Sequence, residues 1–90
     1  MTDPGRICLV AGASRGIGAA VAAALSGEGH RVALLGRDTA ALDKVAAGLA
    51  GPALIVPADV TDAGAADAAF SRIERDWGPV EVLVCSAGAG

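Results

Sequence analysis

The sequence contains no tyrosine, one phenylalanine, one tryptophan, one histidine and two cysteines among its 90 residues. With so few aromatic side chains, we expect a core of valine, leucine, isoleucine and alanine. Two cysteines are too few for a disulfide framework, and the spacing of Cys8 and Cys85 matches no zinc-binding pattern. Both cysteines lie in apolar runs, so we expect buried, reduced thiols and no metal site.

Long hydrophobic runs are also missing, and none approaches the ~20 residues that cross a bilayer. The first six residues lack the basic start and the apolar stretch of a signal peptide. The seven basic residues are scattered along a chain of formal net charge −3. No stripe of basic residues favours nucleic acid or a membrane surface. We therefore expect a cytoplasmic protein that binds neither.

What the sequence does contain is an alternation of short apolar runs and helical patterns. The runs 7–11, 32–35, 53–56 and 80–84 are apolar on both faces, which is typical of strands in a covered parallel sheet. Three helical stripes separate them: Ile17, Val21, Ala24 and Leu25; Leu42, Val45, Ala46 and Leu49; and Ala66, Ala69, Phe70, Ile73 and Trp77. Each stripe predicts a helix with one face on the sheet.

Candidate caps and stops bound these helices. Asp38 or Thr39 is placed to cap the second helix, and Thr61 the third. Glycines at 27, 29, 51 and 78 are placed to end the helices.

The resulting order, β-α-β-α-β-α-β, predicts an α/β domain over residues 1–90. Right-handed crossovers give a parallel sheet in the order 3-2-1-4 with helices on both faces, the N-terminal half of a Rossmann-type fold. The complete fold has six strands, so we interpret the chain as truncated after the fourth. In this order Cys85 lies beside Ala11, which separates Cys8 from Cys85 by roughly 10 Å, too far for a disulfide.

A glycine-rich segment, residues 11–18, joins the first predicted strand to the first helix. Gly12 permits a tight turn, Gly16 lets backbone approach a pyrophosphate, and Gly18 lets the helix pack closely on the strand. The helix N-terminus adds N–H groups and a positive dipole end. Glycines also serve plain turns, but this position between strand and helix favours a dinucleotide site.

Three motifs carry a resemblance to a known family. Residues 12–18, Gly-Ala-Ser-Arg-Gly-Ile-Gly, resemble the nucleotide-binding motif of the short-chain dehydrogenases/reductases. Asp59-Val60 stands where that family has an Asp that binds the adenine amino group, and 85–88, Cys-Ser-Ala-Gly, stands where it usually has Asn-Asn-Ala-Gly. The run 77–84 also looks like the family's approach to that last motif. The resemblance covers the whole chain, and its style is similar to ketoacyl-carrier-protein reductases.

The resemblance implies the NAD(P)(H)-binding portion of an enzyme that transfers hydride between NADP(H) and a carbonyl or alcohol substrate. The full-length enzyme is then expected to be a homo-oligomer. Two positions depart from the family pattern: Ala11 replaces a frequent Thr, and Cys85-Ser86 replaces Asn-Asn. The implied cofactor-binding residues are Gly12, Ser14, Arg15, Gly16, Ile17, Gly18, Arg37, Asp59, Val60, Ser86, Ala87 and Gly88.

The choice of nicotinamide cofactor depends on the end of the second strand. There the family has an acidic residue that binds the ribose 2′-OH and selects NAD, whereas this chain has Gly36 followed by Arg37. Arg15 and Arg37 suit a 2′-phosphate, although either can be a solvated surface charge. Asp38 is placed to bind a 2′-OH or to cap the second helix, and capping is the preferred interpretation. We therefore expect NADP(H), with NAD(H) as the alternative.

No catalytic residue can be assigned. The family uses a Ser-Tyr-Lys set, but this chain has no tyrosine, and its only lysine, Lys44, falls on the exposed side of a helical pattern. His30 is expected in a loop before the second strand. Two other hypotheses remain: a free-standing nucleotide-binding or interaction module, and an inert truncation. A reading frame that continues past Gly90 into Tyr-x-x-x-Lys favours the enzyme.

Overall fold

A computed structural model describes residues 5–12, 16–59 and 62–85 of the chain. They form the predicted alternation of strands and helices. The elements are β1 (Ile7–Ala11), α1 (Gly16–Gly27), β2 (Arg31–Gly36), α2 (Thr39–Ala47), β3 (Ala53–Pro57), α3 (Ala63–Asp76) and β4 (Val82–Cys85). β4 begins two residues later than predicted, because Val80 lies in the loop before it and packs on the core from there.

The four strands form one sheet in the order β3-β2-β1-β4, and every neighbouring pair is parallel. The predicted order and strand directions are therefore confirmed. Ala11 lies opposite Leu35 of β2 on one side and opposite Cys85 of β4 on the other. β1 is thus an inner strand of the sheet, and the glycine-rich segment begins at its end.

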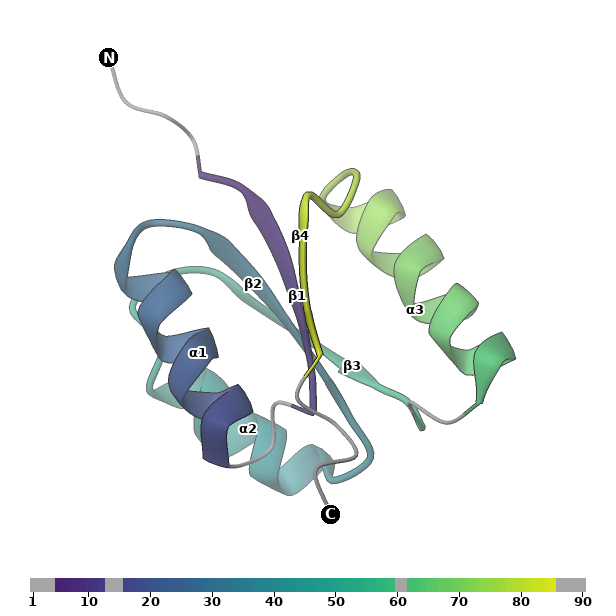
Figure 1. Cartoon of the computed structure of the whole chain (residues 1–90), viewed down its shortest axis with the longest axis horizontal. Helices are drawn as coiled ribbons and strands as arrows, with labels where there is room; N and C mark the ends of the chain where they lie inside the picture. Colours follow the sequence, from purple (N-terminus) through teal and green to yellow (C-terminus); the bar gives the residue numbers. More distant parts are fainter. Residues whose placement is uncertain (1–4, 13–15, 60–61, 86–90) are drawn as a thin grey trace.

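Both faces of the sheet are covered by helices, as Figure 1 shows: α1 and α2 lie on one face and α3 on the other. On the α3 face the buried cluster comprises Ile7, Leu9, Ala11, Ala33, Leu35, Val56, Ala69 and Ile73. On the α1 and α2 face it comprises Val10, Ala22, Val32, Leu34 and Leu42. Alternate residues of β1 and β2 enter opposite clusters, which explains why these strands are apolar without interruption.

The buried face of α1 differs from the predicted one. Ile17 is 75% exposed, whereas the buried residues of the helix are Gly18, Ala22 and Ser26. Their small side chains let the helix axis lie close to the sheet, where an isoleucine would hold it away. The Ser26 hydroxyl accepts a hydrogen bond of 2.8 Å from the Gly51 N–H, so its burial leaves it satisfied.

The stripes of the other two helices are confirmed. Leu42 of α2 is fully buried, and Val45, Ala46 and Leu49 pack against the same cluster. In the α3 stripe Ala69 and Ile73 are buried, Phe70 and the C-cap Trp77 pack against the same cluster, and Ala66 is half-buried.

The observed helix caps show which of Asp38 and Thr39 caps α2, and they correct the predicted cap of α3. Asp38 caps α2, because its Oδ1 accepts a hydrogen bond of 3.1 Å from the Ala41 N–H. The cap of α3 is Asp62 rather than Thr61, which lies outside the described residues. Asp62 is one residue closer to the helix, and its carboxylate reaches two N–H groups of the first turn, at 2.9 and 3.3 Å. The C-cap of α2 is Gly48, three residues before the glycine predicted to end it.

None of the helices in the described part of the chain has the length and hydrophobicity that a membrane span requires.

Candidate functional site

The carboxyl ends of all four strands lie at one edge of the sheet. β1, β2, β3 and β4 end there at Ala11, Gly36, Pro57 and Cys85. From β1 the chain proceeds to β2 and β3 on one side, whereas β4 lies on the other. Such a change of direction is the point at which open α/β sheets bind their ligands, outside the carboxyl ends of the strands. We call this the carboxyl edge.

The described residues of the glycine-rich segment follow β1 at the carboxyl edge and open α1. Gly12 has a φ of 78°, which side chains rarely adopt, and its N–H donates a hydrogen bond of 3.0 Å to the Leu35 carbonyl. This confirms the tight turn predicted at Gly12 and places it against the end of β2. Gly16 opens α1 with a φ of 64°, and a Cβ built on it meets no atom within 4 Å. A side chain at position 16 would therefore meet no atom of the described residues.

The end of β2 carries Gly36 and Arg37, on which the predicted choice of cofactor depends. Gly36 is buried, and its carbonyl accepts a hydrogen bond of 2.9 Å from the Ala58 N–H. A Cβ at Gly36 would stand 3.5 Å from the Leu42 side chain, an ordinary contact. Arg37 is exposed, and the next residue, Asp38, directs its Oδ1 to the α2 cap. The first residue after β2 thus presents an exposed guanidinium. The carboxylate of the next residue already accepts a hydrogen bond.

The end of β3 brings Asp59 to the same edge. Asp59 is half-buried two residues beyond the strand, and its carbonyl accepts a hydrogen bond of 3.0 Å from the Asp62 N–H. That bond closes the turn into α3. Asp59 is therefore joined directly to the residue that caps α3.

Six of the predicted cofactor-binding residues can be placed. Gly12 follows β1, Gly16 opens α1, Ile17 is exposed on the first turn of α1, and Gly18 is buried. Arg37 and Asp59 follow β2 and β3. Ser14, Arg15, Val60, Ser86, Ala87 and Gly88 lie outside the described residues. The structure thus brings predicted residues from three separate segments to one edge.

Cys85 is a correction to the sequence analysis. It is exposed at the carboxyl end of β4, although its apolar run predicted burial. The reason is that β4 pairs with β1 alone in the described part of the chain, and its residues alternate between half-buried and exposed. Cys8 is buried as predicted. Burial raises the pKa of the Cys8 thiol, which lies near the other end of β1.

The structure also shows the positions of Lys44 and His30, to which the sequence analysis assigned no catalytic role. Lys44 is exposed on α2, and His30 lies in the loop before β2, at the opposite end of the sheet from the carboxyl edge. Within the described ranges, no group of three or more His, Cys, Asp or Glu residues is arranged to hold a metal ion.

Comparison with known proteins decides the family. The family model for short chain dehydrogenases matches residues 6–90, nearly the whole chain. The chain belongs to the short-chain dehydrogenase family. Membership in this family confirms the resemblance drawn from the glycine-rich segment and from the two later motifs. It also agrees with the parallel four-stranded sheet observed here.

Several members of the short-chain dehydrogenase family are similar to this chain. The 3-oxoacyl-[acyl-carrier-protein] reductase MabA of Mycobacterium avium is 48% identical over 83 residues, 92% of this chain and 29% of the reductase. A short-chain type dehydrogenase/reductase from Mycobacterium marinum superposes with a TM-score of 0.88 at 37% identity, covering 93% of this chain and 35% of its own. L-sorbose reductase from Gluconobacter frateurii, solved with NADPH and L-sorbose, gives 0.84 at 28%, covering 96% and 34%. The chain spans about a third of the length of each.

Proposed function

We propose that this short-chain dehydrogenase chain binds NADP(H) along its carboxyl edge, as the nucleotide-binding portion of an oxidoreductase acting on a carbonyl or alcohol substrate. One observation carries the proposal: the hydrogen bond from the Gly12 N–H to the Leu35 carbonyl. It holds the glycine-rich turn beside the end of β2. A dinucleotide whose diphosphate lies on the turn therefore has its adenosine ribose next to Gly36 and Arg37.

The diphosphate fits the start of α1. This helix has 12 residues and no acidic side chain in its first turn, so its N-terminal N–H groups and dipole favour an anion. A Cβ at Gly16 would meet no described atom of the chain and would project toward the proposed diphosphate position. We assign Gly12, Ser14, Gly16, Ile17 and Gly18 to this part of the cofactor.

The adenosine ribose distinguishes NADP(H) from NAD(H). Gly36 offers no carboxylate to a ribose 2′-OH, and the exposed Arg37 guanidinium can bind a 2′-phosphate bidentately. Asp38 is engaged in the α2 cap. We assign Arg37, together with Arg15, to the 2′-phosphate. A hydrogen bond between charged groups contributes ~1.5–3 kcal/mol, so one such contact favours NADPH by roughly tenfold or more.

The rest of the cofactor lies toward β3 and β4 in this proposal. We assign Asp59 and Val60 to the adenine, and Ser86, Ala87 and Gly88, after β4, to the nicotinamide-side ribose. The bound nicotinamide supplies the hydride chemistry. The chain's own residues hold the nucleotide, and no proton donor for the substrate is assigned among them.

The relatives support this assignment at the level of the whole enzyme. The L-sorbose reductase was solved with NADPH and its substrate, and MabA is named as a 3-oxoacyl reductase. We propose that a complete protein built on this chain reduces a carbonyl group, or oxidises the corresponding alcohol, with NADP(H). The residues for substrate binding and proton transfer then belong to parts of that protein beyond residues 1–90.

The test is direct titration of purified residues 1–90 with NADPH and with NADH, monitored by calorimetry and by the fluorescence of the reduced nicotinamide. We expect NADPH to bind at least about tenfold more tightly than NADH. Adenosine 2′,5′-bisphosphate should compete with NADPH, and 5′-AMP should compete less well. Absence of NADPH binding would overturn the proposed site, and tighter binding of NADH would overturn the cofactor preference.

A further inference from the structure

Away from the nucleotide, the amino-terminal entry of β1 is held by side chains that can take up a proton. The backbone N–H of Arg6 donates a hydrogen bond of 3.0 Å to Nδ1 of His30, which comes from the loop before β2. On the other flank the Ile7 N–H donates to Oε1 of Glu81, at 3.3 Å. Both hydrogen bonds join residues far apart in sequence. They hold the start of β1 to the segments before β2 and β4, at the end of the sheet opposite the carboxyl edge.

The same entry fits closely against the turn before His30. Gly5 has a φ of 86°, and a Cβ on it would collide with the Gly29 carbonyl oxygen. The Arg31 N–H donates a hydrogen bond of 2.9 Å to the Arg6 carbonyl, which continues the β1–β2 pairing outward. Residues 5 and 6 are therefore docked on residues 28–31 by backbone packing and by the imidazole.

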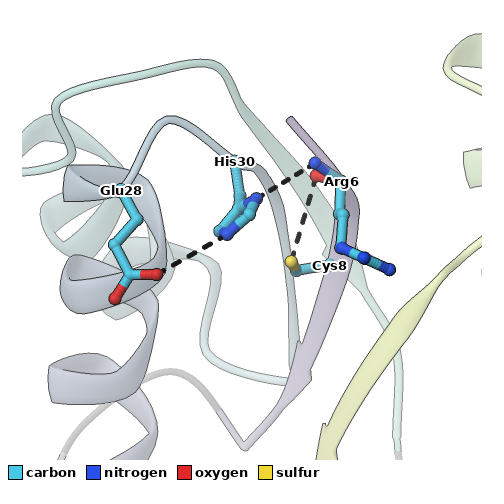
Figure 2. Close-up of polar contacts among 4 residues, drawn as sticks. All are labelled: Arg6, Cys8, Glu28 and His30. Carbon is cyan, nitrogen blue, oxygen red and sulfur yellow. Dashed lines mark hydrogen bonds and ion pairs between the residues drawn. The ribbon is translucent and has the colours of Figure 1, made fainter. Parts of the chain in front are cut away.

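The hydrogen bond at His30 fixes which ring nitrogen bears the proton. A backbone N–H can only donate, so Nδ1 must present its lone pair, and the neutral imidazole carries its proton on Nε2. Figure 2 shows the ring between the Arg6 backbone and the Glu28 carboxylate, with the Arg6 side chain extending away from it. Nε2 lies 3.7 Å from Glu28 Oε1. A second proton can bind only at Nδ1, where it removes the acceptor of the Arg6 N–H.

We propose that His30 is a pH-sensitive latch on the entry of β1: the neutral imidazole holds the Arg6 amide, and protonation at Nδ1 releases it. Glu28 retains the imidazolium on the side of the turn, because the carboxylate attracts the charged ring. The Arg6 N–H is at an exposed position, so water replaces the lost acceptor at little cost. The event loosens residues 5 and 6 without exposing the core.

Among the residues that the structure describes, few charged or titratable groups lie around the latch. Arg6 and Cys8 belong to β1 and its entry, Glu28 to the turn after α1, and Arg31 follows the imidazole in β2. Glu81, before β4, faces the other flank of β1. The loop at 48–52, which approaches His30 from β3, contains no ionisable side chain.

The experiment is amide exchange of the full chain by NMR at pH 8 and pH 5, expressed as protection relative to the unstructured rate at each pH. The protection of the Arg6 amide should fall about three- to tenfold at pH 5, the effect of losing one hydrogen bond. The Leu34 amide, in the buried centre of β2, is the internal reference and should keep its protection. Unchanged protection at Arg6, while the His30 ring resonances titrate, would overturn the proposal.

Two variants separate the latch from general acid sensitivity. In His30→Asn, Oδ1 can accept from the Arg6 N–H but does not titrate, so protection should be the same at both pH values. In Glu28→Gln, the imidazolium loses the carboxylate beside Nε2, so the loss of Arg6 protection at pH 5 should be smaller than in the unmodified chain. If His30→Asn loses Arg6 protection at pH 5 as the unmodified chain does, the imidazole is not the latch.

Discussion

Ala11 of β1 and Cys85 of β4 are direct partners across the parallel pair, and Cys8 lies opposite Val82 at the other end of the same pairing. The two cysteines are therefore offset by three positions along the strands, or roughly 10 Å at ~3.3 Å per residue. Both are free thiols, as the register requires. The same geometry places one thiol at the exposed carboxyl edge and the other in the core.

Only Cys85 should react with a thiol reagent in the folded chain. It is exposed, whereas Cys8 is buried with a raised pKa, which keeps it protonated at pH values where a free thiol ionises. A chromogenic disulfide reagent at pH 8 should label one thiol per chain, and two after denaturation. The Cys85→Ser variant should show no rapid labelling. Rapid labelling of two thiols in the folded protein would contradict the burial of Cys8.

Gly16→Ala should weaken NADPH binding by about tenfold, because the added methyl meets no described atom of the chain and would project toward the proposed diphosphate position. The positive φ also strains an alanine, at a cost of about 1 kcal/mol in the free energy of unfolding. Calorimetric titration gives the affinity, and urea denaturation gives the stability.

The matched control for Gly16 is Gly29→Ala. Gly29 has a φ of 93° and likewise no atom within 4 Å of a built Cβ, but it lies at the opposite end of the sheet. It should lose similar stability and keep its affinity for NADPH. Equal losses of affinity in both variants would show that Gly16 acts through stability alone.

Arg37→Asp should move the preference from NADPH toward NADH, because the substitution replaces a cation at the proposed 2′-phosphate with a carboxylate that can accept from a 2′-OH. We expect the ratio of dissociation constants to change by about tenfold or more. Arg75→Asp, in the last turn of α3 at the other end of the sheet, makes the same change in charge and should leave the ratio unaltered. An unchanged ratio in Arg37→Asp means that Arg37 does not contact the 2′-phosphate.

Asp38 should act on stability rather than on cofactor choice. Asp38→Ala removes the cap of α2 and should lower the free energy of unfolding by about 1 kcal/mol. Asp38→Asn keeps an acceptor at the cap and should retain that stability, with an NADPH to NADH ratio within about twofold of the original. A marked loss of NADH affinity in Asp38→Asn would instead identify Asp38 as a ribose ligand.

Residues 1–90 alone should show no reductase turnover. Hydride transfer to a carbonyl requires a proton donor beside the oxygen, the family's donor is a tyrosine near a lysine, and this chain contains no tyrosine. NADPH oxidation should be measured against a panel of ketones and ketoacyl thioesters, with a no-protein reaction as control. Turnover clearly above the control would contradict the assignment of the chain as a nucleotide-binding portion only.

Patterns local to one segment were predictable from the sequence. The apolar runs predicted the strands, and the position of Gly12 between a strand and a helix predicted a backbone conformation that other residues rarely adopt, which its φ of 78° confirms. Asp38 was preferred as a cap because its side chain precedes a helical stripe, and the cap was found. The cap of α3 was misassigned to Thr61 because two adjacent residues were both good caps. Only the geometry of the turn shows that Asp62 reaches the helix N–H groups.

The sequence alone determined the alternation of strands and helices. Because right-handed crossovers leave little choice of topology, this alternation also determined the parallel strand order, which brings Gly12, Arg37 and Asp59 to one edge. The tertiary structure decided which side of an almost wholly apolar helix is buried. In α1 no polar residue marks the outer face, so the closest approach to the sheet selects Gly18 and leaves Ile17 outside. It also decided the exposure of Cys85. An apolar run looks the same in a strand with two neighbours and in one that, like β4 in the described part of the chain, pairs with a single strand, so the run did not reveal that Cys85 is exposed.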